Sequence, residues 1–594
     1  MFKIKLENVS KHETLIPIFY DEPEYSNFWK RTYTLFILVF SIALAIRIAQ
    51  FFFLRISDPS FNHLLYGIDT KGYDDLAQMI LAGDWLLRAV PIHNMGPLYV
   101  YFLAIIYGIF GHHYEAAHAV QYFLGAASAA TIFLAARLWF SNRVAFLAGF
   151  FPSLSATLIV YEGYLLAEGL IFFLTSLIML FTGLARRNPN RWGYWLLLGI
   201  VLGLAAVQRA NILLCTLGIM FWITFGFNKY ILRRRALSLA IFLFGIVLAL
   251  TPTTLHNRIF GGQWVLTTNS GPINFYLGNG IEATGTLYFG SLHDQHLKEV
   301  NAGTTTWWKL LSDDIKSDPG RWITVMLKKT YIFWAAYDPP DDFNYELHKR
   351  FTPFTESSQL PYYLVTSLGF VGMVIAWPRR RLLMELYFFI FIYMISVVIV
   401  IISGRYRLLE MAPMSIFAGV ALWKMVTWIH SRQWRSFTAT CASIMALLFL
   451  FNIYTLEAFP IRMNDYGMLA RYYDKDGNTA SSLATMQEGV RTFERAPKGD
   501  AIFEDTRKTA LFFGRGQLAR SYIKAARWQD AKSVLKLQIQ SGHYDESIVL
   551  MLIQTYTQLG EKNQAVTLAR NMLNEFPGNS QLQSVLQETG NMPK

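Results

Sequence analysis

Polar and ionisable side chains gather in residues 67–103, between two strongly apolar regions of the chain. Apolar residues from Tyr73 to Leu81 recur at the spacing of one helical face, which predicts a short amphipathic helix ending near Gly83. Such a helix beside a membrane span lies flat in the interface. Asp69, just ahead of this helix, is therefore expected at the lipid–water boundary, where a carboxylate can take a proton from an acceptor hydroxyl.

Three further candidates for chemistry are ionisable side chains within or between apolar runs, namely Glu168, Arg405 and Arg407. Glu168 lies inside an apolar run, where a charge is costly and usually functional, although a glutamate there can also end a helix at the headgroups. Arg405 and Arg407 stand in a turn between two runs, where an arginine can anchor the interface or fork onto a phosphate. Carboxylates and arginines in one pocket at the membrane edge favour acid–base chemistry on a phosphate-bearing lipid.

Other polar residues are interpreted structurally or stay open. Asp74 and Asp75 are expected on a solvated helix face. Arg47, near the outer end of the first apolar run, is expected to extend its guanidinium to the interface. His256 lacks the spacing of a metal ligand, but with Arg258 it opens a large polar stretch, and both stay candidates for contact with the substrate.

The composition indicates a membrane protein. Of the 594 residues 53% are hydrophobic and 16% aromatic, and several apolar blocks reach the ~20 residues that cross a bilayer as a helix. The net charge of +12 does not indicate a nucleic-acid partner, because Lys and Arg gather in short loops between apolar blocks. The two cysteines fall in separate apolar blocks, which argues against a disulfide scaffold. The first 30 residues are polar and mixed, so no cleavable signal peptide is expected.

Five basic loops orient the chain by the positive-inside rule. They all fall on the cytoplasmic side if the N-terminus does and if the short run 97–111 does not cross. The eleven predicted spans are 33–54, 115–139, 143–160, 164–185, 192–209, 211–227, 236–255, 360–377, 382–402, 408–428 and 436–457. We therefore predict an all-α, multi-pass membrane protein. Its parts are a cytoplasmic segment 1–32, a membrane domain 33–457 with outer loops 55–114 and 256–359, and an extracytoplasmic tail 458–594.

Several of these residues follow one another in a familiar order. Asp69, Tyr73 and Ala77 precede Ala-Gly-Asp-Trp at 82–85, and Pro-Leu-Tyr follows at 97–99. The further matching segments are 165–174, 271–289 and the Arg-Tyr-Arg of 405–407. The order and spacing resemble C-superfamily (GT-C) membrane glycosyltransferases, in the bacterial group related to protein O-mannosyltransferases and the lipid A aminoarabinose transferase. The resemblance covers about residues 30–430.

The chain departs from the family pattern in three places. The second acid of the family's Asp-Glu pair is Thr70, and the arginine before the tyrosine is Gly72, with Lys71 able to replace its charge. Asn94-Met95 stands where the aminoarabinose transferase has Glu-Lys. The identity of the donor sugar therefore does not follow from the resemblance.

The resemblance implies transfer of a sugar from a polyprenyl-phosphate donor to a protein, lipid or polysaccharide acceptor on the outer face of a bacterial plasma membrane. Asp69 is then the general base of a single inverting displacement, and Glu168 positions the acceptor or a metal. Arg405 and Arg407 are expected to hold the departing phosphate, and Lys71 and Tyr73 are further candidates for substrate contact. A divalent metal ion is left open, with Asp69 and Glu168 as its candidate ligands.

The tail carries a pattern of its own. Tyr522 and Tyr556 are 34 residues apart, as are Ala531 and Ala565, and Pro577 closes the second unit. This is the tetratricopeptide period, predicted over about 512–579. Such a small helical domain can dock a protein partner or cap the membrane domain.

Two other functions compete with the glycosyltransferase. A transporter or flippase for a lipid-linked sugar would tend to show internal repeats and broken helices at mid-membrane, whereas the polar groups here gather on one face. An envelope assembly scaffold would use the helical tail and an inactive membrane domain. Product formation from a labelled polyprenyl-phosphate sugar separates the enzyme from both.

Overall fold

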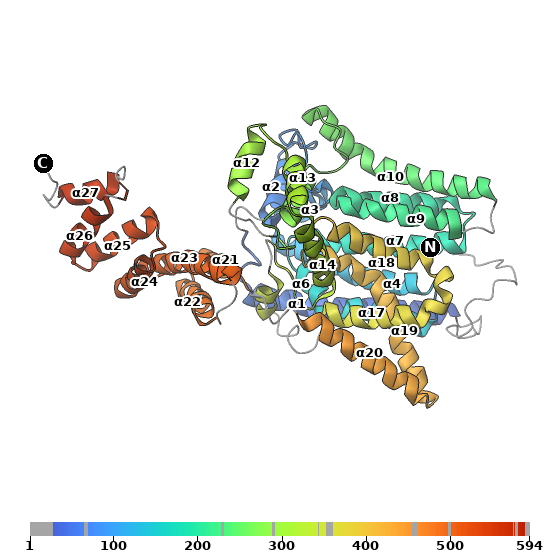
Figure 1. The fold of residues 1–594 in the computed structure, drawn as a ribbon. Coiled ribbons are helices and arrows are strands. Elements are labelled where there is room, and N and C mark those ends of the chain that lie inside the picture. The colour runs from blue at the N-terminus through green and yellow to red at the C-terminus, as the bar shows by residue number, and fades with distance from the viewer. Residues whose placement is uncertain are drawn as a thin grey trace. The chain divides into compact units, whose positions relative to one another are not determined.

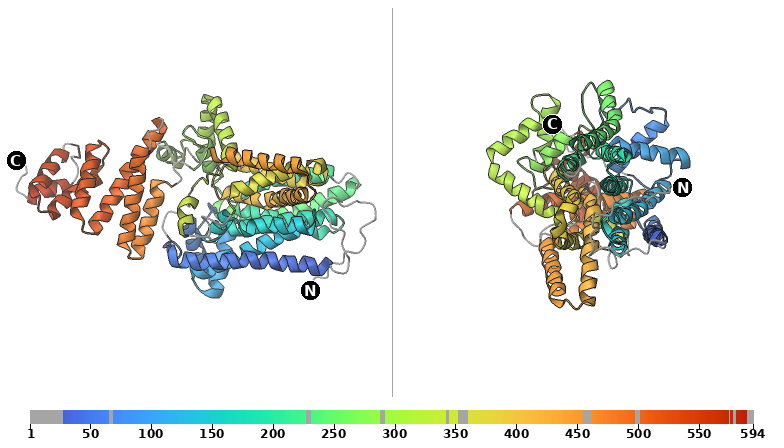
Figure 2. Two further views of the ribbon diagram at one scale, coloured as in Figure 1. Left: turned by 90° about the horizontal axis from the view of Figure 1, so that it is seen from below. Right: turned by 90° about the vertical axis from the view of Figure 1, so that its right-hand side faces the viewer.

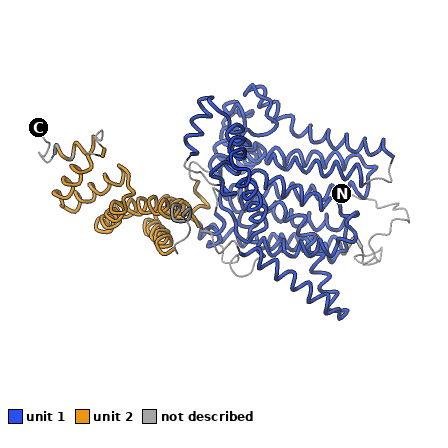
Figure 3. Tube along the Cα trace, viewed as in Figure 1, with its two compact units in different colours: residues 1–58, 66–460 blue, residues 59–65, 461–594 orange. Residues whose placement is uncertain are grey.

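The computed structural model describes residues 28–64, 69–226, 231–287, 292–341, 344–351, 360–453, 461–496, 501–573, 575–576 and 580–588. Most of the predicted segment 1–32, and Pro577, lie outside the described residues. The described chain is helical, with two isolated β-bridges, which confirms the all-α prediction. It divides into two compact units, residues 1–58 with 66–460 and residues 59–65 with 461–594 (Figure 3).

Unit 1 is a bundle whose long helices run side by side (Figures 1 and 2). Its first half contains α1 (Phe28–Ser57), α2 (Asp69–Leu81), α3 (Pro97–Phe110), α4 (Tyr114–Ala136), α5 (Asn142–Ser153), α6 (Ala156–Glu162), α7 (Glu168–Arg187), α8 (Trp192–Gln208), η1 (Ala210–Leu214), α9 (Cys215–Phe221), η2 (Trp222–Gly226) and α10 (Leu232–Gly261). Its second half contains α11 (Gly271–Asn279), α12 (His293–Asn301), α13 (Trp307–Ser317), α14 (Pro319–Trp334), α15 (Tyr345–His348), η3 (Lys349–Phe351), α17 (Tyr362–Ala376), η4 (Trp377–Leu382), α18 (Met384–Val398), η5 (Tyr406–Glu410), α19 (Met411–His430) and α20 (Trp434–Asn452).

Six helices of the described chain are long and apolar enough to cross a membrane, or seven if one bent pair counts as a single span. The bent pair, 362–382 with 384–398, turns by 119°. The predicted count of eleven spans is therefore not confirmed. One physical reason is that the run 143–160 breaks after Ser153 into α5 and α6, which have 12 and 7 residues and are each too short to cross alone.

Glycines let two pairs of helices in unit 1 approach closely. At Gly199 of α8 a Cβ atom would lie 2.1 Å from the Phe242 carbonyl oxygen of α10. At Gly372 of α17 it would lie 1.9 Å from the Phe417 carbonyl oxygen of α19. Small residues at helix contacts are typical of membrane proteins, where close van der Waals packing drives association. These contacts hold α8 and α19, whose ends border the candidate site.

A buried ion pair joins α1 to α6. Arg47 bonds to the two Glu162 carboxylate oxygens at 2.6 and 3.0 Å, and both side chains are almost fully buried. Gly125 of α4 makes room for the pair, because a Cβ there would lie 2.3 Å from a Glu162 oxygen. The expectation that Arg47 reaches the interface is therefore wrong: its partner lies 115 residues away, and a buried arginine that is paired does not need solvent.

Unit 2 is a series of helices, each packed against the next. They are α21 (Met463–Lys475), α22 (Thr479–Arg495), α23 (Ala501–Lys524), α24 (Trp528–Gln540), α25 (Glu546–Gln558), α26 (Lys562–Leu573) and α27 (Ser580–Glu588). Tyr522 and Tyr556 are buried on α23 and α25, and Ala531 and Ala565 on α24 and α26. The tetratricopeptide assignment itself stays a prediction.

Candidate active site

Arg405 stands at the centre of a charged cluster in unit 1. Its Nη2 atom lies 2.6 Å from an Asp69 carboxylate oxygen, and its Nε lies 2.5 Å from Asp341 Oδ2. The Ser403 hydroxyl donates to the same Asp341 oxygen at 2.6 Å. Asp69 and Arg405 are 336 residues apart, so the fold brings together two residues that were predicted to share a site.

Glu168 and Arg209 form the second half of this cluster. Arg209 Nη2 lies 2.6 Å from Glu168 Oε1, and Arg209 Nη1 donates to the Arg405 carbonyl oxygen at 3.3 Å. The same Glu168 oxygen lies 3.9 Å from Arg405 Nε. The Arg209 guanidinium also lies over the Tyr406 ring at 4.3 Å, as a cation–π contact. The two predicted catalytic acids, Asp69 and Glu168, thus both lie beside Arg405.

Helix ends position the ionisable groups. Asp69 is the first residue of α2 and Glu168 the first of α7, where the positive end of the helix dipole favours a carboxylate. Arg209 lies at the break between α8 and η1, and Arg405 lies between α18 and η5. These breaks in the helices let the backbone turn, so that both guanidinium groups face the carboxylates.

The cluster has more carboxylates than cations. Its acids are Asp69, Glu168 and Asp341, and its cations are Arg209 and Arg405, so three negative charges face two positive ones. Burial by itself would lower the pKa of Arg405, but the facing Asp341 and Asp69 carboxylates raise it well above its ordinary value. Arg405 is therefore a permanent cation held between acids.

Tyr73 lies behind Asp69 on α2. Its side chain is buried, its hydroxyl accepts a hydrogen bond from Gln208 Nε2 at 2.9 Å, and its ring meets the edge of Tyr99 at 4.8 Å. Burial, and next the Asp69 charge, raise the pKa of the Tyr73 hydroxyl above its ordinary value, so it stays neutral. These contacts hold the start of α2 in place, and the predicted contact of Tyr73 with substrate stays a prediction.

Asp74 differs from the expectation. Its side chain is fully buried and bonds to His112 Nε2 at 2.7 Å, Gln78 Nε2 at 2.8 Å and Lys71 Nζ at 3.3 Å. The prediction of a solvated face is wrong for Asp74, because α2 packs this side against α3 and the turn that follows it. Asp75 is 51% exposed and pairs with Lys71. Lys71, a predicted substrate contact, thus pairs with the acids of its own helix.

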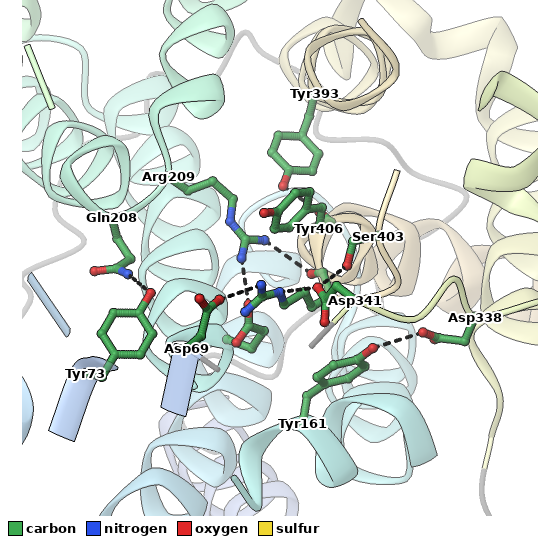
Figure 4. Close-up of polar contacts among 12 residues, drawn as sticks. Asp69, Tyr73, Tyr161, Gln208, Arg209, Asp338, Asp341, Tyr393, Ser403 and Tyr406 are labelled. Atoms are coloured by element: carbon green, nitrogen blue, oxygen red, sulfur yellow. Dashed lines mark hydrogen bonds and ion pairs between the residues drawn. The ribbon is translucent and has the colours of Figure 1, made fainter. Parts of the chain in front are cut away.

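Arg407 belongs to a neighbouring buried cluster. Its guanidinium donates to the Ala335 carbonyl oxygen at 2.6 Å, lies 3.3 Å from Asp338 Oδ2, and covers the Tyr362 ring at 4.4 Å. Tyr161 donates to the other Asp338 oxygen at 3.0 Å (Figure 4). The side chain of Arg407 is 1% exposed, so its predicted contact with a phosphate would require these bonds to break.

His256 and Arg258 lie at the end of α10. His256 stacks on His93 at 4.1 Å and contacts the Val90 carbonyl oxygen at 2.9 Å. Arg258 donates to the Gly262 carbonyl oxygen and lies over the Trp264 ring. Within the described residues these contacts do not join the Arg405 cluster, so their predicted role in substrate binding stays a prediction.

The candidate metal ligands are paired with arginines. Asp69 bonds to Arg405 and Glu168 to Arg209, and among the described residues there is no group of three or more His, Cys, Asp or Glu arranged to hold a metal ion. This donor set, with each acid already facing a guanidinium, does not fit a metal in the present geometry.

Three residues of the cluster, Arg209, Asp341 and Ser403, are not among the sequence-based candidates. Arg209 ends an apolar run, and an ionisable residue at membrane depth is a signal of function. Asp341 follows a Pro-Pro pair in the large polar stretch, where nothing in the local pattern distinguishes it from neighbouring acids. The signal for Arg209 is thus present in the sequence, whereas that for Asp341 is not.

Comparison with known proteins gives one family match. Residues 94–254 match the family model described as dolichyl-phosphate-mannose-protein mannosyltransferase. This segment contains Glu168 and Arg209 but neither Asp69 nor Arg405. The match confirms the predicted relationship to the C superfamily of membrane glycosyltransferases.

Two solved structures are similar at low identity. One is ArnT from Cupriavidus metallidurans bound to undecaprenyl phosphate, with 14% identity and a TM-score of 0.41 over 91% of this chain and 80% of that chain. The other is the Archaeoglobus fulgidus oligosaccharyltransferase tethered with an acceptor peptide, with 15% identity and a TM-score of 0.40 over 72% of this chain and 55% of that one. No curated protein matches the chain. TM-scores this low transfer no residue role, so the proposed roles rest on the geometry of this chain.

Proposed function

We propose that the protein transfers a sugar from a polyprenyl-phosphate donor to an acceptor on the extracytoplasmic face, with Asp69 as the general base. The observation that carries this proposal is the placement of Arg405 between Asp69 and Asp341. The Asp69 side chain is 31% exposed, whereas that of Arg405 is 9% exposed. The partly exposed Asp69 carboxylate can be reached by an acceptor hydroxyl. The more buried Arg405 guanidinium suits the anionic phosphate of the leaving group.

The reaction follows from the partners of Arg405. A donor phosphate competes with Asp69 for the guanidinium, because both are oxyanions and Arg405 can fork onto either. Asp69, released from Arg405, takes the proton of the acceptor hydroxyl. The acceptor oxygen forms a bond to the anomeric carbon as the bond from that carbon to the phosphate oxygen breaks. The electron pair of the broken bond stays on the lipid phosphate, whose growing charge Arg405 stabilises.

The helix ends support the proposed membrane orientation. α7 begins at Glu168 and ends with Arg186 and Arg187, and α10 begins with the basic run 233–235. The cluster and the basic end of α7 thus lie at opposite ends of that helix. Basic loops mark the cytoplasmic side, so the cluster belongs to the extracytoplasmic side. Reporter fusions after Arg381 and at the C-terminus should report cytoplasm and exterior respectively, and the reverse result would contradict this orientation.

The decisive test is transfer by the purified protein. A radiolabelled polyprenyl-phosphate sugar and a cell-envelope extract should yield labelled acceptor with the parent protein and almost none with Asp69→Asn. Movement of the labelled lipid across vesicles without transfer would instead indicate a transporter. Absence of both would favour a scaffold.

A further inference from the structure

The segment 271–289 matches the family pattern, yet the proposed reaction gives it no role. Its described part packs against the non-helical backbone that follows α18. Asn279 Nδ2 donates to the Ile399 and Val400 carbonyl oxygens, both at 3.0 Å. The Ile402 amide donates to the Gly285 carbonyl oxygen at 3.2 Å, and Ile402 pairs with Thr286 in a parallel bridge. The segment therefore holds the backbone that leads into Arg405.

Lys329 of α14 bonds to both of these segments and holds them together. Its Nζ donates to the Gly278 carbonyl oxygen at 3.1 Å, Asn279 Oδ1 at 2.8 Å and the Val400 carbonyl oxygen at 3.2 Å. The side chain has no exposed surface. An ammonium group has three donors, and these three acceptors on two chain segments satisfy all of them.

The fit around Lys329 is tight on both segments. A Cβ at Gly278 would lie 2.0 Å from the Val400 carbonyl oxygen. Gly285 has a φ of +94°, and a Cβ there would lie 2.9 Å from Lys329 Cγ. Only glycine allows the two backbones to approach as closely as the ammonium requires.

The backbone of residues 399–402, which Lys329 contacts at Val400, leads directly to Arg405. Ser403 and Gly404 connect Ile402 to Arg405, and both contact the loop that carries Asp341. The Ser403 hydroxyl donates to Asp341, and the Gly404 amide donates to the Pro339 carbonyl oxygen at 2.9 Å. Displacement of the backbone before Ser403 would therefore move Arg405 relative to both of its acids.

We propose that Lys329 is a positioning residue, which holds the 278–286 segment on the 399–402 backbone and so sets the place of Arg405. The proposal rests on the proposed function, because Arg405 is assigned there to the donor phosphate. A buried ammonium carries a desolvation cost, and burial lowers the pKa of Lys329 to about 7. A residue needed only to fill this space would be apolar and free of that cost.

The first experiment measures the backbone directly and needs no activity. Hydrogen exchange is followed in the peptide 399–405 for the full-length Lys329→Met and Lys329→Gln variants, with Lys328→Met as the matched control. We expect exchange to quicken by about 10-fold in Lys329→Met, by less in Lys329→Gln, and not at all in the control. Unchanged exchange in this peptide, or equal quickening throughout unit 1, would overturn the proposal.

The second experiment tests the link to Arg405. Binding of undecaprenyl phosphate is measured for Lys329→Gln in the parent and in an Arg405→Ala background. If Lys329 acts through Arg405, its substitution weakens binding several-fold in the parent and by less than about 2-fold without Arg405. Equal weakening in both backgrounds would overturn the proposal. If the parent binds the lipid but transfers no sugar, the proposed function fails, while the exchange result still decides the role of Lys329.

Discussion

Arg405 and Arg407 stand two residues apart in one turn, yet their surroundings differ. Arg405 lies between two carboxylates, one of which is partly exposed. Arg407 bonds to a buried acid and to backbone carbonyl groups, which leaves it 1% exposed. The sequence pattern assigns both arginines the same role, but only Arg405 can exchange a partner for a ligand without opening the core. We therefore expect a role in substrate binding for Arg405, whose partner Asp69 is partly exposed, and a structural role for Arg407.

The largest effect is expected at the accessible partner. Asp69→Asn keeps the shape of the side chain and removes the base, so turnover should fall by a factor of roughly 10²–10⁴. Steady-state rates at saturating donor and acceptor measure this loss, and the thermal midpoint checks that the fold persists. Near-normal turnover would remove Asp69 from the mechanism.

The next effect concerns stability. Arg407→Ala leaves the buried Asp338 without its cation, which should cost about 3–5 kcal/mol of folding free energy. Thermal unfolding in detergent should show this loss, with a reduced yield of folded protein. A fully stable variant with impaired donor binding would instead indicate that Arg407 binds the donor phosphate.

In the kinetics of the folded protein, Arg405→Ala should act mainly on the donor, and the variant should also be less stable because Asp341 loses its buried cation. Loss of a charge-assisted hydrogen bond costs about 1.5–3 kcal/mol, which equals roughly a 10- to 150-fold change in donor kcat/KM. Arg405→Lys should reduce donor kcat/KM by a smaller factor, because lysine keeps the positive charge but cannot make the bidentate contact of a guanidinium. Varying donor and acceptor separately measures the effect, and a defect confined to the acceptor would contradict the phosphate assignment.

The smallest expected effects are the changes in stability on replacing Asp74 and Asp75 of α2. Asp75→Asn removes an exposed ion pair and should change stability by at most about 1 kcal/mol. Asp74→Asn disturbs three bonds of a fully buried carboxylate and should destabilise the protein more. Comparing the two thermal midpoints checks this order, and equal midpoints would show that the burial of Asp74 is unimportant.

Local pattern predicts the helical class and several residues of the cluster, but not their partners. Asp69, Glu168 and Arg405 stand out in the sequence because charges are rare beside apolar runs. Asp341 does not, because its partner Ser403 lies 62 residues away, across a turn that only the tertiary fold creates. Hydropathy does not show where a helix breaks, so the count of eleven spans is not confirmed. Helical spacing alone does not reveal what packs on the polar side of α2, which is why the prediction for Asp74 is wrong.

The short segment 59–65 belongs to unit 2 although its sequence neighbours belong to unit 1. Lys475 donates to the Leu64 carbonyl oxygen at 2.6 Å, and His63 meets Asp476 at 2.5 Å, across 413 residues of chain. At a synthesis rate of about 5–20 residues per second, Asp476 is synthesised roughly 20–80 seconds after His63. The first loop to emerge is thus among the last to acquire its final contacts, and a chain cut short before α21 would never complete it.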